Sequence, residues 1–135
     1  MADTTIEDAA KDPSKWDLIV LPGGMPGAEH LRDCKTLVEL MKHQQAAQKL
    51  YAAICASPAV ALVPHGLAKA GSTCYPAEAF RAKIPNASND PVVVQDNLIT
   101  SQGPGTSLLF ALQLGEQLYG KEAADGIAKA MLVTR

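Results

Sequence analysis

The sequence has few aromatic residues and no long apolar run. Aromatic residues make up 4% of its 135 residues, so the core must be built from Ala, Leu, Val and Ile. No apolar stretch approaches the roughly 20 residues of a membrane-spanning helix. The opening residues, Met1 to Thr4, lack the basic start and apolar stretch of a secretory signal. We therefore expect no membrane partner and a cytoplasmic location.

Cysteine is scarce and scattered, at Cys34, Cys55 and Cys74. An odd, widely spaced set argues against a disulfide framework and for a reducing compartment. The three histidines show no metal-ligand spacing with one another or with the cysteines, and we expect neither a metal nor a cofactor. A net charge of -2, from 12 basic and 14 acidic residues, gives no nucleic-acid-binding signature.

The length and a hydrophobic content of 47% suit one globular domain, residues 1–135. Continuous apolar runs alternate with segments of helical spacing, which predicts an α/β layer fold with a mainly parallel sheet. A polar opening, residues 4–15, has room for one short helix. The expected strands cover residues 17–21, 51–54, 71–75, 92–95 and 98–100, and the expected helices 37–49, 58–63, 76–83, 107–119 and 121–129.

The stretch Tyr51 to Ala59 carries the strongest chemical signal. It predicts a short buried strand, a sharp turn at Cys55 and a helix that starts near Ser57 and Pro58, because proline is tolerated in the first turn of a helix. At such a turn, free N–H groups and the helix dipole favour a thiolate, as in a nucleophile elbow with Cys in place of Ser. The alternative is a buried structural cysteine, since free cysteine is often buried.

Two loops rich in glycine and proline follow expected strands. Pro22 to Gly27 comes after the first strand, and Ser101 to Thr106 follows the last one and leads into the longest expected helix. In open α/β sheets, ligands bind at the carboxyl ends of the strands. The first loop, at the carboxyl end of the first expected strand, is therefore a candidate for a binding edge.

These motifs, in this order, resemble those of the ThiJ/PfpI superfamily, above all its Parkinsonism-associated deglycase branch. The resemblance implies a flavodoxin-like (class I glutamine amidotransferase-like) three-layer sandwich, usually dimeric. The matching stretches are Leu21-Pro22-Gly23-Gly24, Ala53-Ile54-Cys55-Ala56, Thr73-Cys74-Tyr75-Pro76, Thr100-Ser101-Gln102-Gly103-Pro104-Gly105-Thr106 and Gly120-Lys121-Glu122.

The resemblance also implies roles for individual residues. Cys55 would be the nucleophile, the backbone of Gly23, Gly24 and Ala56 would lie near a developing oxyanion, and Tyr75 would be a site neighbour where some relatives carry histidine. Members of the superfamily convert methylglyoxal or glyoxal to hydroxy acids, or remove early glycation adducts. The resemblance thus implies a cofactor-independent glyoxalase or deglycase that acts on small α-oxoaldehydes or glycated substrates.

Other functions remain open. A redox-sensing, chaperone-like stress protein would need an oxidisable Cys55 but no turnover. A protease is disfavoured because Ala56 stands where the protease branches carry histidine directly after the cysteine. Amide transfer from glutamine is disfavoured because no His/Glu pair is recognisable after the elbow.

The chain departs from the superfamily pattern at its amino-terminal side. The strands and helix that normally precede the equivalent of Thr4, with the glutamate that partners the nucleophile, have no counterpart here. Glu29, Glu39 and Glu78 lie in other segments, and we interpret them as surface residues. We therefore expect an N-terminally truncated domain, which forms a homodimer or is completed by a second chain.

Overall fold

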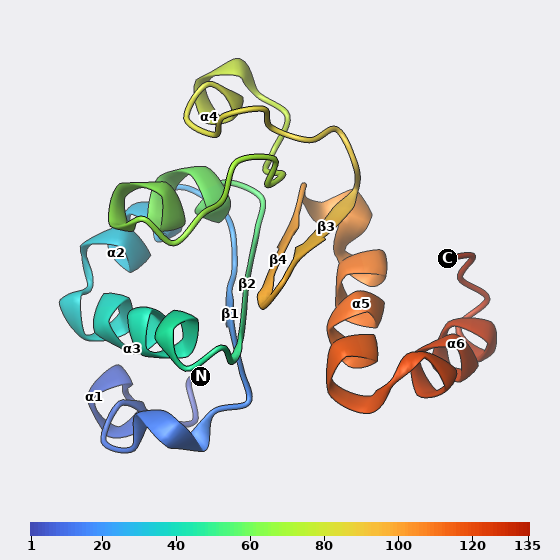
Figure 1. Cartoon of the computed structure of the whole chain (residues 1–135), viewed down its shortest axis with the longest axis horizontal. Coiled ribbons are helices and arrows are strands. Elements are labelled where there is room, and N and C mark those ends of the chain that lie inside the picture. Colours follow the sequence, from blue (N-terminus) through green and yellow to red (C-terminus); the bar gives the residue numbers. More distant parts are fainter.

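A four-stranded sheet with strand order β1-β2-β4-β3 forms the centre of the computed structural model, which describes all 135 residues (Figure 1). β1 (Leu18–Leu21), β2 (Leu50–Ile54) and β4 (Leu98–Ser101) are parallel. β3 (Val92–Gln95) runs antiparallel to β4 at the far edge. The α/β class with a mainly parallel sheet is therefore confirmed.

β2 is an inner strand of the sheet, and its burial agrees with that position. Tyr51, Ala52 and Ala53 are fully buried, as expected of a strand that is paired on both sides and covered on both faces. In the register, Ala52 lies between Val20 of β1 and Ile99 of β4. The small alanines let helices approach both faces of the sheet closely.

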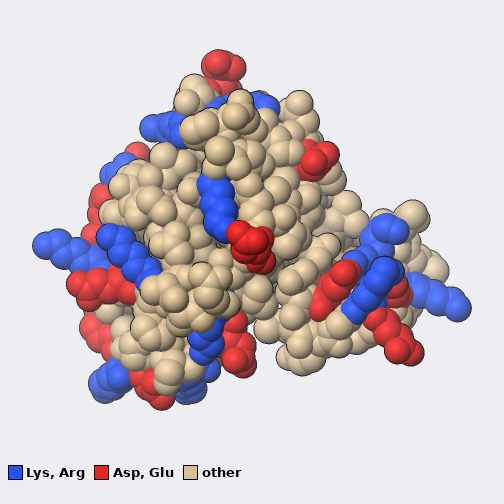
Figure 2. Space-filling model, viewed as in Figure 1, with Lys and Arg blue, Asp and Glu red and all other residues tan.

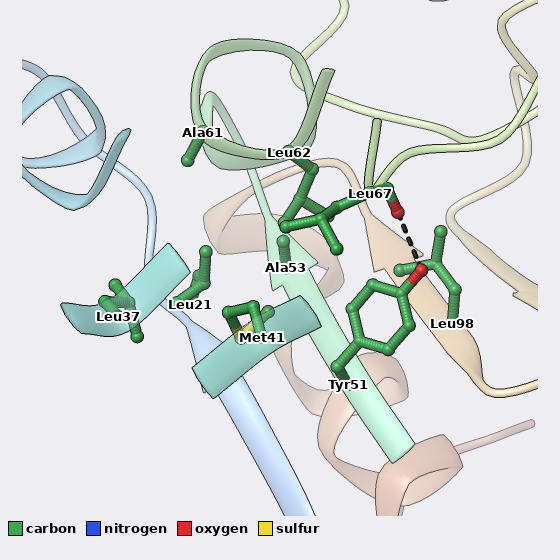
Figure 3. Close-up of a cluster of buried hydrophobic side chains, with 9 residues drawn as sticks. All are labelled: Leu21, Leu37, Met41, Tyr51, Ala53, Ala61, Leu62, Leu67 and Leu98. Atoms are coloured by element: carbon green, nitrogen blue, oxygen red, sulfur yellow. Dashed lines mark hydrogen bonds between the residues drawn. The ribbon is translucent and has the colours of Figure 1, made fainter. Parts of the chain in front are cut away.

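One face of the sheet packs against α3 (Lys35–Ala46) and the π-helix η2 (Pro58–Leu62), and α2 (Gly27–Asp33) packs on these two helices. In Figure 3, the hydroxyl of Tyr51 donates to the carbonyl of Leu67 at 2.7 Å. Burial raises the pKa of Tyr51, which keeps this donor protonated. The largest cluster of buried apolar side chains lies on this face and consists of Leu21, Leu37, Met41, Tyr51, Ala53, Ala61, Leu62, Leu67 and Leu98.

The opposite face packs against α5 (Ser107–Tyr119), which places Phe110 on Ala52 and Ile99. Helices on both faces complete a three-layer sandwich. α6 (Lys121–Ala130) packs on α5 and lies away from the sheet (Figure 1). This side of the molecule leaves apolar side chains partly uncovered: Val20 is 39% exposed, Leu108 53% and Ile127 53%.

The third strand expected over residues 71–75 is wrong. The segment makes single contacts instead of a ladder: Thr73 N–H donates to the Thr100 side chain at 3.0 Å, and Tyr75 N–H donates to the Cys55 carbonyl at 2.8 Å. β2 and β3 already occupy both edges of β4. Only the side chain of Thr100 is therefore accessible to the segment.

Most of the other expected elements form, with shifted ends. The helix expected over residues 76–83 shrinks to α4 (Glu78–Arg81), and the one over 58–63 is η2 followed by the 3₁₀ turn η3 (Val63–His65). α3 ends before Gln48, whose φ of +57° is left-handed. The polar opening forms α1 (Ile6–Ala9), capped by Thr5, and the 3₁₀ turn η1 (Pro13–Lys15). The hairpin between β3 and β4 turns at Asp96 and Asn97, and α5 covers the expected residues 107–119.

Charged side chains of both signs alternate around the rim of the molecule and over α6, as Figure 2 shows, which is the pattern of a solvated surface. None of the helices combines the length and apolar character needed to cross a membrane.

Tyr51→Phe tests the buried hydroxyl. The change leaves the carbonyl of Leu67 unpaired in the core, so we expect the free energy of unfolding, measured by urea denaturation, to fall by about 1–3 kcal/mol. Tyr119→Phe is the matched control, because its ring is 78% exposed, and should change stability by less than about 0.5 kcal/mol. Equal stability of the two variants would contradict a stabilising role for this hydrogen bond.

Candidate active site

Cys55 follows β2 directly and has a left-handed backbone, with φ at +66°. For a residue other than glycine this conformation costs roughly 1–2 kcal/mol. Two hydrogen bonds hold it: the Cys55 N–H donates to the Ser101 carbonyl at 3.0 Å, and the Cys55 carbonyl accepts from the Tyr75 N–H at 2.8 Å. The turn is therefore fixed by the strand end on one side and by the 71–75 segment on the other.

The helix after the turn is tied to the loop after β1. Val60 N–H donates to the Ala56 carbonyl at 2.9 Å and closes the first turn. The hydroxyl of the fully buried Ser57 donates to the carbonyl of Pro22. This contact holds the 22–27 loop, which contains a cis peptide bond between Met25 and Pro26, against the cysteine turn.

Gly23 lies in direct contact with the cysteine. A Cβ at this position would lie 2.4 Å from the Cys55 Cβ, 2.9 Å from the Ile54 carbonyl oxygen and 3.1 Å from the Cys55 Sγ. Real side chains do not approach so closely, so only glycine fits without a shift of the backbone.

Gly24 is required for its conformation instead, because its φ is +91° and a Cβ there would meet open space. Its carbonyl accepts from the Ala28 N–H at 2.9 Å. The N–H groups of Gly24 and Ala56, on either side of the cysteine turn, donate to no atom of the protein. Two backbone donors, one in the loop that contacts the cysteine and one in the residue after it, thus have no acceptor within the protein.

The third segment of the site is the loop after β4. The Thr106 hydroxyl oxygen lies 3.1 Å from the Gly103 N–H, 3.3 Å from the Gln102 N–H and 2.7 Å from the Ser101 hydroxyl. One threonine side chain therefore fixes this glycine-proline turn before α5 begins.

These three segments enclose a cleft of about 330 Å³. Pockets that bind small molecules range from about 300 to 1,000 Å³, so this cleft suits a compact ligand. Because it lies at the carboxyl ends of β1, β2 and β4, it occupies the edge where open α/β sheets bind ligands. Its lining consists of Gly23, Gly24, Ile54, Cys55, Gly103, Pro104 and Ser107.

The structure places the residues singled out from the sequence in three ways. Cys55, Gly23 and Gly24 share the cleft, whereas Ala56 is buried and does not line it. Tyr75 lines a neighbouring cleft instead, which shares Gly103 with the first. Sequence reasoning assigned no site role to the residues contributed by the 101–106 loop and α5, although the glycine-proline signal marked that loop.

Acidic side chains are absent from the lining of the cleft. Glu39 and Glu78 are exposed, as expected of surface residues, while Glu29 is half-buried on α2. No group of three or more His, Cys, Asp or Glu side chains in the structure could hold a metal ion. The chemical groups at hand are therefore a thiol, a hydroxyl and backbone N–H groups.

The other two cysteines lie in different surroundings. Cys74 is fully buried beside Ala59 and Ile84, and this burial raises the pKa of its thiol, which disfavours the reactive thiolate. Cys34 precedes α3 and packs against the main core cluster. Neither lines the cleft, so Cys55 is the one thiol in it.

Comparison with known proteins agrees with this geometry. The sequence model of the DJ-1/PfpI family matches residues 1–117. Protein DJ-1 homolog B of Arabidopsis thaliana is 45% identical over 134 residues, which cover 98% of this chain and 30% of that protein. Glutathione-independent glyoxalase DJR-1.2 of Caenorhabditis elegans is 36% identical over 124 residues, which cover 89% of this chain and 64% of that protein. The chain thus spans less than a third of the Arabidopsis relative.

Among solved structures, oxidized Toxoplasma gondii DJ-1 superposes with a TM-score of 0.90 at 41% identity. The match covers 99% of this chain and 72% of that one. The flavodoxin-like sandwich expected from the sequence is confirmed by this likeness together with the observed sheet.

Gly23→Ala tests the close approach at the cysteine. The added methyl group must displace backbone, so we expect a loss of about 1–3 kcal/mol in stability. We also expect slower alkylation of Cys55, which peptide mapping measures. Gly105→Ala is the matched control, since a Cβ there meets no atom within 4 Å. In both proteins Cys55 should be labelled before Cys74. Wild-type stability and labelling in Gly23→Ala would show that the glycine is dispensable.

Proposed function

Because the chain belongs to the DJ-1/PfpI family, we propose that it is a cysteine-dependent glyoxalase, with Cys55 as its nucleophile, that acts in carbonyl and oxidative stress defence. One observation carries the proposal: a left-handed cysteine lines a cleft of about 330 Å³, and the N–H groups of Gly24, which also lines the cleft, and of the residue after the cysteine, Ala56, have no acceptor within the protein. The C. elegans relative named as a glutathione-independent glyoxalase supports the same reaction. Glycated proteins or nucleotides are further substrates of this proposed class.

In the proposed reaction, the Cys55 thiolate attacks the aldehyde carbon of methylglyoxal or glyoxal and forms a hemithioacetal. The proton on this carbon then moves to the neighbouring carbonyl carbon and the hydroxyl proton moves to that carbonyl's oxygen, which leaves a thioester. Water cleaves the thioester, releases the hydroxy acid and restores the thiol. The overall change adds one water to the oxoaldehyde, so it consumes no redox cofactor.

Backbone donors support the first step. The N–H groups of Gly24 and Ala56 have no partner within the protein, and both adjoin the cysteine turn. We assign them, with the close approach of Gly23, to the oxygen that becomes negative when the thiolate adds. Donors already fixed in place stabilise such a charge without reorganising, which is why oxyanion sites are effective.

The proton transfer has no carboxylate in the lining of the cleft. Glu29, Glu39 and Glu78 do not line it, so none of them is assigned the acid/base role. General acid–base catalysis contributes about 10²–10⁴-fold. We therefore propose that this chain alone turns over more slowly than a relative with a carboxylate beside its cysteine.

Cys55→Ser tests the enzymatic proposal. We expect methylglyoxal consumption by the purified protein to fall at least ~100-fold, because removal of a nucleophile removes the covalent route. Cys34→Ser is the matched control, because that side chain packs against the core and should leave turnover intact. Persistent turnover in Cys55→Ser would overturn the role of Cys55.

A redox-sensing, chaperone-like role is the second candidate. Cys55 is half-buried and so remains accessible to an oxidant, and a related structure is of an oxidized protein. Three free cysteines favour a reducing compartment such as the cytoplasm. Absence of turnover in the wild type, together with peroxide-dependent sulfinate formation at Cys55, would select this candidate over the enzyme.

We also propose that the chain associates, as a homodimer or with a second chain, through its uncovered apolar side. β1 is an edge strand whose Val20 is partly exposed, and Leu108 and Ile127 are exposed on the helices of the same side. Unpaired edges and apolar patches favour pairing with another chain.

Light scattering at several protein concentrations tests this association. Val20→Lys should shift the protein toward the monomer, because it places a charge at the exposed edge strand β1. Val94→Lys is the matched control, since Val94 is a similarly exposed valine on the opposite edge strand, β3. A wild-type protein that stays monomeric at every concentration would contradict the proposal.

A further inference from the structure

A second cleft adjoins the one that contains Cys55. It has a volume of about 180 Å³ and shares Gly103 and Pro104 with the first cleft. Its remaining lining comes from Tyr75, Gln102 and their neighbours, and none of these side chains is charged. The two clefts therefore meet at Gly103 and Pro104, and the second offers only uncharged groups.

Tyr75 forms the aromatic wall of this second cleft. Its ring lies against Gly103, where an added Cβ would be 3.4 Å from Cδ2, and it contacts Phe80 edge to face, with the ring centroids 6.3 Å apart. Its N–H donates to the Cys55 carbonyl at 2.8 Å, which ties its backbone to the cysteine turn. Yet 43% of Tyr75 is exposed. The ring is thus held in place and still presents an open surface.

These features identify a ligand chemistry. Aromatic rings pair favourably with other flat, apolar groups, by about 0.5–1.5 kcal/mol beyond the area that they bury. A cavity of about 150 Å³ is large enough to bind benzene, and the second cleft has a similar volume but is open to solvent, so a planar ring would lie along its surface rather than be enclosed. The absence of charged side chains from its lining disfavours phosphate or carboxylate substituents.

We propose that the second cleft is a subsite for the substituent of an α-oxoaldehyde, and that Tyr75 makes this subsite prefer a planar aryl group over methyl. The assignment of α-oxoaldehyde as the substrate class rests on the proposed glyoxalase function. The subsite itself rests on the shared lining of the two clefts and on the ring of Tyr75, which is held by its contacts with Gly103 and Phe80. Tyr75 is then a specificity-determining residue, in contact with substrate but outside the bond-making step.

The subsite can be tested without turnover. Phenacyl bromide and bromoacetone differ only in phenyl against methyl, and each alkylates a thiolate when the C–S bond forms and bromide leaves. Mass spectrometry monitors the labelling of Cys55 by each reagent, and the measured quantity is the ratio of the two second-order rate constants. The same ratio for N-acetylcysteine removes the intrinsic difference between the reagents.

We expect the corrected ratio to favour the phenyl reagent in the wild type and to fall about 2- to 10-fold in Tyr75→Ala, as loss of one aromatic contact predicts. Tyr75→Phe retains the ring and should retain the ratio, which separates loss of the contact from misfolding. Tyr119→Ala, an exposed aromatic outside both clefts, should leave both rate constants unchanged. An unchanged ratio in Tyr75→Ala would overturn the subsite.

Turnover of phenylglyoxal and methylglyoxal separates this proposal from the one on which it rests. Lack of Cys55-dependent turnover of either aldehyde, with the alkylation ratio still dependent on Tyr75, would overturn the glyoxalase function and support the subsite. Turnover of both aldehydes, with a ratio of their kcat/KM values that Tyr75→Ala leaves unchanged, would support the glyoxalase function and overturn the subsite.

Discussion

Cys55 is held in a left-handed conformation by hydrogen bonds from two directions, and the candidate site depends on this constraint. β4 accepts its N–H through Ser101, and the 71–75 segment donates to its carbonyl through Tyr75. The roughly 1–2 kcal/mol cost of that conformation is offset by structure on both sides. The side chain is thereby turned toward Gly23, and no side chain larger than hydrogen fits there.

Parallel pairing of β1, β2 and β4 explains why residues far apart in the sequence meet at the cysteine. Their carboxyl ends lie at one edge of the sheet, so the loops at residues 22–27 and 101–106 converge on the turn at Cys55. Each loop is held by one hydroxyl: Ser57 binds the carbonyl of Pro22, and Thr106 binds the backbone of Gly103. The rigid parts of the site are therefore backbone, while its reactive part is a single thiol.

Both sides of the sheet are covered by helices, but unequally. The side with Tyr51 and Met41 holds the largest buried cluster, whereas the side with Phe110 leaves Val20 of the edge strand β1 partly in solvent. α6 extends this second side through its contact with α5 rather than with the sheet. The candidate site is therefore built at the ends of the strands, whereas the partly uncovered apolar surface lies along their face.

Local sequence was sufficient to predict the strands at β1, β2 and the β3–β4 hairpin, the start of the turn at Cys55, and the helix α5, because apolar runs, proline and glycine act on the backbone within a few residues. It failed at residues 71–75, which form no ladder because both edges of β4 are already occupied. The contact of Gly23 with Cys55, the free N–H groups of Gly24 and Ala56, and the position of Tyr75 beside a second cleft were decided only by the tertiary structure. Each of these depends on distances between segments separated by about 20 residues or more, and such distances are set by how the strands pair and the helices pack rather than by any local preference.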